Sequence, residues 1–96
     1  MEQRKKRASS TVQWTTIKGK FFHTFDEDGY AQYQGQIVDL VGDDIAIVLY
    51  FEWSSGSPSY HKAVWVSDIV DEGWALYNTD VAWRDALKSK LVKTRP

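Results

Sequence analysis

The side chains best suited to chemistry in this sequence are two histidines and a set of carboxylates. His23 and His61 are the only histidines, and each stands alone in a segment expected to be a strand. Neither has a second His, a Cys or a carboxylate at a spacing typical of metal ligands. We therefore expect both to be packing or hydrogen-bonding residues, and we expect no metal site and no cofactor.

The carboxylates are concentrated in turns, at residues 26–28, 43–44 and 71–72. Carboxylates in turns are normally solvated, and no pair occupies the contrasting environments that acid–base catalysis needs. Ser59 and Lys62 have the Ser-x-x-Lys spacing of penicillin-recognising enzymes, but the Lys-Thr-Gly partner motif is missing. The chain also contains no cysteine. The sequence therefore predicts a protein that is not an enzyme.

The aromatic content is the most informative feature of the composition. The 96 residues include 5 Trp, 5 Tyr and 4 Phe, which are more rings than a small core easily buries. We expect some to line a binding surface, and the candidates are Tyr33, Trp53, Tyr60 and Trp65. Acidic loops beside aromatic rings favour a cationic ligand, such as a basic peptide or a methylated ammonium. In the alternative interpretation, these rings pack against a helix or a second subunit.

The formal net charge of −1 conceals three segments of different sign. Residues 1–20 carry a net charge of +5, residues 21–80 carry −10 and residues 81–96 carry +4. Residues 1–12 show no hydrophobic periodicity, and we interpret them as a flexible basic arm. This arm contains four adjacent cations, Arg4, Lys5, Lys6 and Arg7. The two basic ends make nucleic-acid binding an alternative function, although the acidic body repels phosphates.

Residues 45–53 form the segment around which the expected fold is organised. They are β-branched and aromatic and are bounded by turn residues, which is typical of a strand. Both faces of this strand are apolar, so one must be covered by a small sheet and the other by a helix or a second subunit. Turn and strand signals predict five strands, near residues 21–25, 30–41, 45–53, 60–66 and 74–77. Residues 26–29 are typical of a hairpin turn, with glycine at the last position. Gly35 suggests a bulge or bend in the second strand, and residues 67–69 suggest a short helical turn with Ile69 beneath the barrel.

The last segment has a helical period. Trp83, Leu87 and Leu91 recur at i, i+4 and i+8, after Asn78 or Thr79 as the capping residue. This pattern predicts an amphipathic helix over residues 79–92. The fold class predicted from these elements is mainly β, a small SH3-like five-stranded antiparallel barrel with a C-terminal α-helix. Residues 13–96 form this single domain.

Residues 33–38, Tyr-Gln-Gly-Gln-Ile-Val, resemble a Trp-Gln-Gly-Gln-Ile-Val stretch of the type II (plasmid-borne) dihydrofolate reductases. That resemblance implies an SH3-like barrel over about residues 21–69. The family binds folate and NADPH through a Val-Gln-Ile-Tyr tetrapeptide on the strand before the short helical turn. The matching residues here, 61–65, read His-Lys-Ala-Val-Trp, so the tetrapeptide is absent. Folate and NADPH binding is therefore the third function considered.

A broader resemblance, over residues 20–83, is to uncharacterised bacterial mobile-element proteins. It is carried by several separate motifs in the same order: Phe22-His23-Thr24-Phe25, Gly29, Gln34-Gly35-Gln36, Phe51-Glu52-Trp53, Gly56, Trp74 and Tyr77. The resemblance implies a fold and an origin in a bacterial mobile element, but it implies no mechanism.

These observations predict a non-catalytic binding or adaptor module that recognises a protein, a peptide or a cationic ligand. No apolar run approaches the roughly 20 residues of a membrane-spanning helix, and the basic N-terminus is not followed by a signal-peptide core. We expect a cytoplasmic protein with no membrane partner. One short helix leaves part of the apolar surface uncovered, so we also expect a homodimer.

Overall fold

The computed structural model describes residues 16–53 and 55–94, so the predicted arm with Arg4, Lys5, Lys6 and Arg7 lies outside the described residues. Within these residues, five strands and two α-helices follow one another. They are β1 (Phe21–Phe25), β2 (Ala31–Val41), β3 (Ile45–Phe51), β4 (Pro58–Trp65), α2 (Val66–Asp71), β5 (Ala75–Tyr77) and α3 (Asp80–Lys88).

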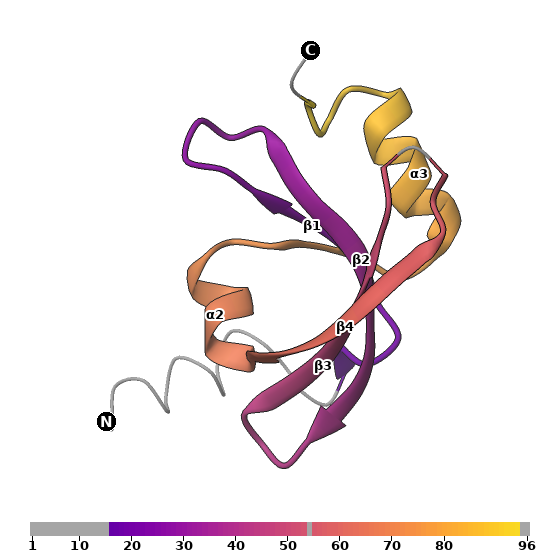
Figure 1. Cartoon of the computed structure of the whole chain (residues 1–96). Helices are drawn as coiled ribbons and strands as arrows, with labels where there is room; N and C mark the ends of the chain where they lie inside the picture. The colour runs from indigo at the N-terminus through magenta and orange to yellow at the C-terminus, as the bar shows by residue number, and fades with distance from the viewer. Residues whose placement is uncertain (1–15, 54, 95–96) are drawn as a thin grey trace.

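All five strands belong to one antiparallel sheet with the order β4-β3-β2-β1-β5 (Figure 1). The prediction of a mainly β fold with five antiparallel strands and a C-terminal helix is confirmed. Closure of the sheet into a barrel is not found, because the edge strands β4 and β5 are not hydrogen-bonded to each other in the described part of the chain. Among the described strands, the sheet therefore has two edges, β4 and β5.

The turn between β1 and β2 forms as its sequence predicts. The Asp26 carboxylate accepts hydrogen bonds from the backbone N–H groups of Asp28 (2.9 Å) and Tyr30 (3.0 Å). Gly29 follows with φ of 87°, a conformation that glycine adopts without steric cost. The Asp-x-Asp-Gly sequence thus serves to close a hairpin.

Gly35 has a different role from the one its sequence suggested. It pairs regularly with Phe22 on β1 and with Tyr50 on β3, and the register of β2 shifts on either side of it, against β3 between Ile37 and Asp39 and against β1 between Ala31 and Gln34. The predicted bulge is therefore not at Gly35 itself, and the alternative of a bend there stays a prediction. A Cβ atom at Gly35 would lie 2.0 Å from the carbonyl oxygen of Leu49. Glycine is required there because two backbones approach too closely for any side chain.

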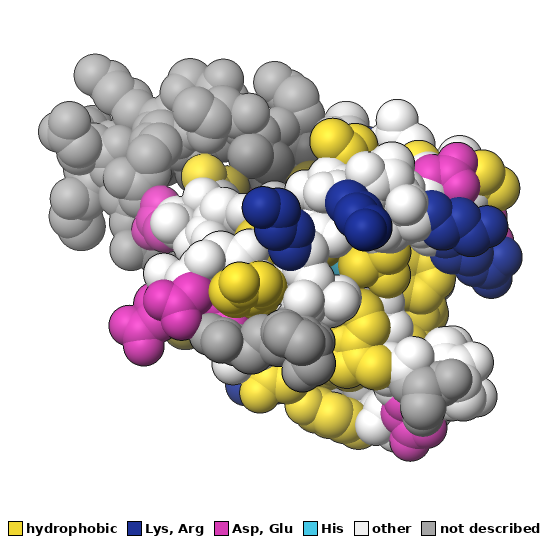
Figure 2. All heavy atoms as spheres, turned by 90° about the horizontal axis from the view of Figure 1, so that it is seen from above, with side chains coloured by type: hydrophobic (Ala, Val, Ile, Leu, Met, Phe, Trp, Pro, Cys, Tyr) yellow, Lys and Arg dark blue, Asp and Glu magenta, His cyan; other side chains and the backbone are white. Residues whose placement is uncertain are grey.

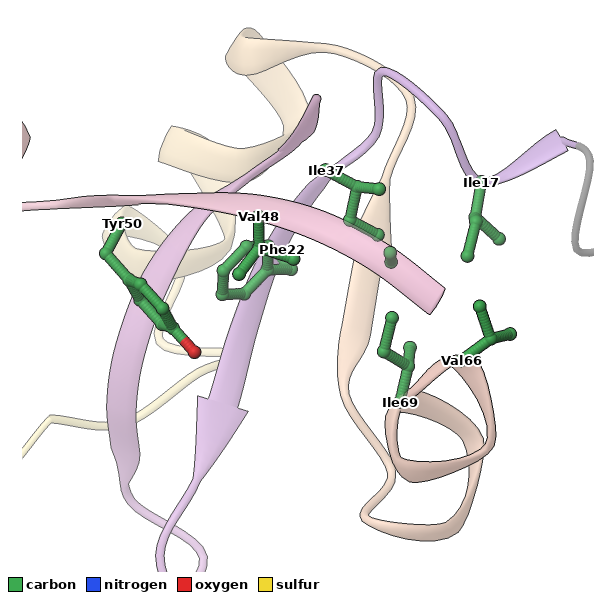
Figure 3. Close-up of a cluster of buried hydrophobic side chains, with 8 residues drawn as sticks. Ile17, Phe22, Ile37, Val48, Tyr50, Val66 and Ile69 are labelled. Atoms are coloured by element: carbon green, nitrogen blue, oxygen red, sulfur yellow. The ribbon is translucent and has the colours of Figure 1, made fainter. Parts of the chain in front are cut away.

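The inner face of the sheet holds the hydrophobic core, which α2 covers (Figure 3). Alternate residues of β3 point inward, and Ala46, Val48 and Tyr50 are buried. Val66 and Ile69 of α2 pack into the same cluster, so the prediction that Ile69 lies beneath the sheet is confirmed. The complete set of buried members is Ile17, Phe22, Ile37, Ala46, Val48, Tyr50, Val66 and Ile69.

Helix α3 lies over the outer face, beside β1 and β5. The Thr79 hydroxyl accepts a hydrogen bond from the backbone N–H of Ala82 (3.1 Å), which confirms Thr79 as the N-cap. The helix ends at Lys88, and Lys90 adopts the left-handed conformation (φ 63°). Leu91 consequently lies beyond the helix and is 83% exposed. The prediction of a helix that extends to residue 92, with Leu91 on its apolar face, is wrong.

Neither described helix combines the length and the apolar character needed to cross a membrane.

Candidate ligand-binding site

The aromatic side chains gather in two groups on opposite faces of the sheet. Phe21 and Phe22 are neighbours on β1, so their side chains point to opposite faces. Phe21 stacks on Trp83 of α3, with ring centroids 5.4 Å apart. Phe22 instead contacts Trp74 (4.7 Å) and Tyr50 (5.7 Å) on the inner face. Strand β1 thus contributes side chains to two separate aromatic clusters.

We call the outer group the covered cluster, because α3 lies over it. Its members are Phe21, His23, Phe51, Trp53, Tyr77 and Trp83. Trp83 is 6% exposed, and its indole N–H donates a hydrogen bond to the carbonyl oxygen of Phe22 (3.2 Å). That bond satisfies the only polar atom of the ring, which is the usual condition for burying a tryptophan. The covered cluster therefore fixes the helix to the sheet.

His23 lies at the centre of the covered cluster. Its imidazole is stacked between Trp53 and Trp83, with both centroid distances 6.0 Å, and it is fully buried. Nδ1 forms a hydrogen bond with the Tyr77 hydroxyl (2.9 Å), while Nε2 has no hydrogen-bond partner among the described residues. Burial lowers the pKa of His23 from about 6.5 to about 4, and Gln34 offsets part of that effect. His23 is therefore a neutral packing residue at physiological pH.

The inner group opens to solvent at a pocket of about 380 Å³, which we call the aromatic pocket. Its walls come from five places in the chain: β1, β2, β3, β4 and the segment that runs from α2 to the start of β5. The lining residues are Thr24, Phe25, Gln32, Tyr33, Tyr50, Lys62, Ala63, Val64, Trp65, Asp68, Glu72 and Trp74. The volume is within the range of small-ligand sites.

A row of three tyrosines crosses the inner face beside the aromatic pocket. The Tyr33 ring meets Tyr50 edge to face at 5.5 Å, and Tyr60 stacks on the other side of Tyr50 at 4.9 Å. The row forms because the inner positions of β2, β3 and β4 lie side by side in the antiparallel register. Burial raises the pKa of Tyr50, and the charges of Tyr60, Tyr33 and Glu72 raise it further. The Tyr50 hydroxyl therefore stays protonated at neutral pH and can donate a hydrogen bond.

Three charged side chains line the aromatic pocket: Lys62 of β4, Asp68 of α2, and Glu72 just after that helix. The Trp74 indole N–H donates a hydrogen bond to the Glu72 carboxylate (3.0 Å), so this carboxylate is held beside an aromatic ring. No ion pair joins Lys62 to either carboxylate in the described part of the chain. Two negative charges against one positive charge, next to aromatic faces, suit a cation.

The predicted binding residues do not all meet at one site. Tyr33 and Trp65 line the aromatic pocket and are 48% and 52% exposed. Tyr60 does not line it, but it contacts the pocket residue Tyr50. Trp53 belongs to the covered cluster, and its indole N–H donates a hydrogen bond to the carbonyl oxygen of Gln32 (3.2 Å). Two of the four candidates therefore line the aromatic pocket, and a third contacts one of its lining residues.

Several residues of the aromatic pocket were not predicted. Tyr50 and Trp74 carry aromatic surface, and Asp68 supplies charge, yet none was a candidate. The inward position of Tyr50 could be read from the alternation of β3. The position of Trp74 could not, because it depends on where the chain returns after α2. Of the turn carboxylates noted in the sequence, only Glu72 lines the pocket.

The outer face of β3 and β4 carries apolar residues beyond the reach of α3. Trp83 contacts Phe51 at one end of β3, while Ile45, Ile47 and Leu49 are half-buried. Ile45, Ala63, Val64 and Trp65 line a shallow hollow there. Figure 2 shows that hydrophobic side chains are also open to solvent on the face seen from above. The expected homodimer would use such a surface, and it stays a prediction.

Comparison of the chain with family models, with curated proteins and with solved structures finds no match. The resemblances to type II dihydrofolate reductases and to mobile-element proteins stay predictions from sequence. Within the described ranges, no group of three or more His, Cys, Asp or Glu side chains could hold a metal ion.

Proposed function

We propose that this protein is a binding module that takes a cationic group of a protein or peptide partner into the aromatic pocket. The observation that carries the proposal is the composition of the pocket walls. Tyr33 and Trp74 provide aromatic faces, Trp65 lines the pocket from the end of β4, and the carboxylates of Asp68 and Glu72 outnumber the single ammonium of Lys62. A cation placed over an aromatic face and near a carboxylate gains from both interactions.

The wider charge distribution supports the same ligand class. The described residues carry seven Lys and Arg against twelve Asp and Glu, a net charge of −5. An acidic surface of this kind attracts cations and increases their rate of encounter with the pocket. The hydrogen bond from Trp74 to Glu72 positions one carboxylate before any ligand arrives, which lowers the entropic cost of binding.

Titration with small cations tests the proposal directly. n-Butylguanidinium and tetramethylammonium should bind and change the tryptophan fluorescence, whereas butyrate should not. Glu72→Gln should weaken the binding of the guanidinium by about fivefold, which corresponds to roughly 1 kcal/mol. Glu27→Gln is the matched control, because Glu27 is an exposed carboxylate that does not line the pocket. Equal affinity for butyrate and for the cations would refute the proposal.

Nucleic-acid binding is the second candidate, and one observation favours it. Lys88, Lys90 and Lys93 are exposed, and none forms an ion pair with another described residue. Phosphate contacts of this kind are sensitive to salt. A filter-binding assay with single-stranded and duplex DNA, at 50 and 200 mM salt, tests this candidate, with the triple lysine-to-alanine variant as the comparison. Folate and NADPH binding, the third candidate, is tested by the same fluorescence titration with those two ligands.

A further inference from the structure

Strand β4 is a long edge strand with little protection against further pairing. Seven of its eight residues pair with β3 on one side, from Ile45 opposite Trp65 to Phe51 opposite Pro58, and a register shift leaves Ser59 without a partner on β3. On its other side no described strand is paired with it. Every residue of β4 is exposed or half-buried. Natural edge strands are usually blunted by charges, prolines or covering segments, and β4 has only Lys62 and, at its first position, Pro58.

The aromatic pocket reaches this free edge. Lys62, Ala63, Val64 and Trp65 all line it, and these four residues are consecutive in β4. Successive side chains of a strand point to opposite faces, so a pocket on one face would contact only every second residue. A pocket that contacts four in a row must include the edge of the strand itself. A ligand in the pocket is therefore within reach of the unpaired backbone N–H and C=O groups of β4.

The other part of the pocket lining comes from strands that are not neighbours of β4. It is formed by Thr24, Phe25, Gln32 and Tyr33 of the first two strands, together with Trp74. These strands lie beyond β3 in the sheet order, and none is paired with β4. The pocket thus occupies a gap between β4 and the first two strands.

We propose that the partner is an extended, basic peptide segment that pairs with the free edge of β4 as a sixth strand and places one Arg or Lys side chain in the aromatic pocket. The inference rests on the proposed function of the pocket and adds the form of the partner. Backbone hydrogen bonds along β4 supply affinity without regard to sequence, and the pocket supplies selectivity for the cation. Charge complementarity selects this partner, because Asp68 and Glu72 face the gap and the described chain is acidic.

The test compares three probes. The first is the capped heptapeptide acetyl-TVTRTVT-amide, the second is the same peptide with alternate backbone nitrogens methylated, and the third is n-butylguanidinium. N-methylation removes strand-forming donors and leaves the arginine side chain unchanged. We expect the first peptide to bind at least tenfold more tightly than the methylated peptide. We also expect it, unlike n-butylguanidinium, to slow amide hydrogen exchange in β4.

The remaining outcomes separate the inference from the function on which it rests. If both peptides and n-butylguanidinium bind equally well and β4 exchange is unchanged, the pocket binds cations but strand addition is refuted. If no probe binds, the proposed function fails and the inference fails with it. If β4 becomes protected on concentrating the protein alone, a second copy occupies the edge and the peptide proposal is overturned. Glu72→Gln should weaken binding of the first peptide, and Glu27→Gln should not.

Discussion

Trp83 and Trp65 are the same residue type, one on α3 and the other at the end of β4, yet Trp83 is 6% exposed and Trp65 is 52% exposed. Trp83 stacks on Phe21 beneath its own helix, and its indole N–H is bonded to a buried carbonyl. Trp65 ends β4 and lines a pocket that opens to solvent. The residue types in the two aromatic groups are alike, so what separates a packing role from a binding role is the element that covers them.

The covered cluster should respond most strongly to the loss of its largest ring. Trp83→Ala removes stacking against Phe21, Phe51 and His23 and leaves a cavity beneath α3. We expect the free energy of unfolding to fall by about 3–5 kcal/mol, measured by urea denaturation. Trp83→Phe should recover part of the loss if the full truncation does not fold. A change below about 1 kcal/mol would show that α3 does not hold the cluster together.

Protonation of His23 should make the free energy of unfolding depend on pH. Its pKa is about 4 in the folded protein and near 6.5 in the unfolded chain, so between these values only the unfolded chain binds the proton. The free energy of unfolding should therefore fall as the pH decreases from about 6.5 to 4, by up to about 3 kcal/mol. His23→Gln should remove this part of the pH dependence, whereas the variant of the exposed His61, His61→Gln, should retain it. Identical pH profiles for wild type and His23→Gln would contradict the burial of a neutral imidazole.

A smaller effect is expected from the start of α3. Thr79→Ala removes the hydroxyl that accepts the N–H of Ala82, and loss of an N-cap costs about 1 kcal/mol. Because α3 lies over the covered cluster, a less stable helix should expose the tryptophans of that cluster. Acrylamide quenching of tryptophan fluorescence should therefore also increase. Thr94→Ala, at an exposed threonine beyond the helix, is the control and should change neither quantity. No loss of stability in Thr79→Ala would mean that the cap is not formed in solution.

The smallest effect on stability should come from a substitution at the aromatic pocket. Trp65→Ala removes a ring that is already half exposed, and we expect a change in the free energy of unfolding within about 0.5 kcal/mol. The same substitution should weaken the binding of n-butylguanidinium by several-fold, because an aromatic wall of the pocket is lost. A loss of stability above about 2 kcal/mol would place Trp65 with the packing residues, and the contrast with Trp83 would then disappear.

Sequence reasoning located the elements of this molecule better than its candidate site. The hairpin at residues 26–29, the Thr79 cap and the burial of Ile69 were predicted because each depends on a local signal. The end of α3 was missed because the helical pattern continues to Leu91, and Lys90 adopts the left-handed conformation without being a glycine.

The aromatic pocket depends on contacts that no local pattern records. Ring content selected Trp53 together with Tyr33, Tyr60 and Trp65, but Trp53 stacks on His23 on the other face. The walls of the pocket come from segments far apart in the sequence, and only their tertiary placement brings Trp74 and Glu72 to the same pocket as Tyr33. The sequence could predict that an aromatic surface with acidic groups exists, but it could not predict which residues form that surface.

The strand order has a consequence for the route by which the chain folds. From β1 to β4 each strand pairs with the next, so three successive hairpins can form by closing short loops. Strand β5 must instead return to β1, where His23 and Tyr77 meet across 54 residues of sequence. Closing so long a loop costs more conformational entropy, and such contacts form late. Helix α3 follows β5, so we expect the covered cluster, whose Trp83 and His23 are both buried in the folded protein, to be the last part to assemble.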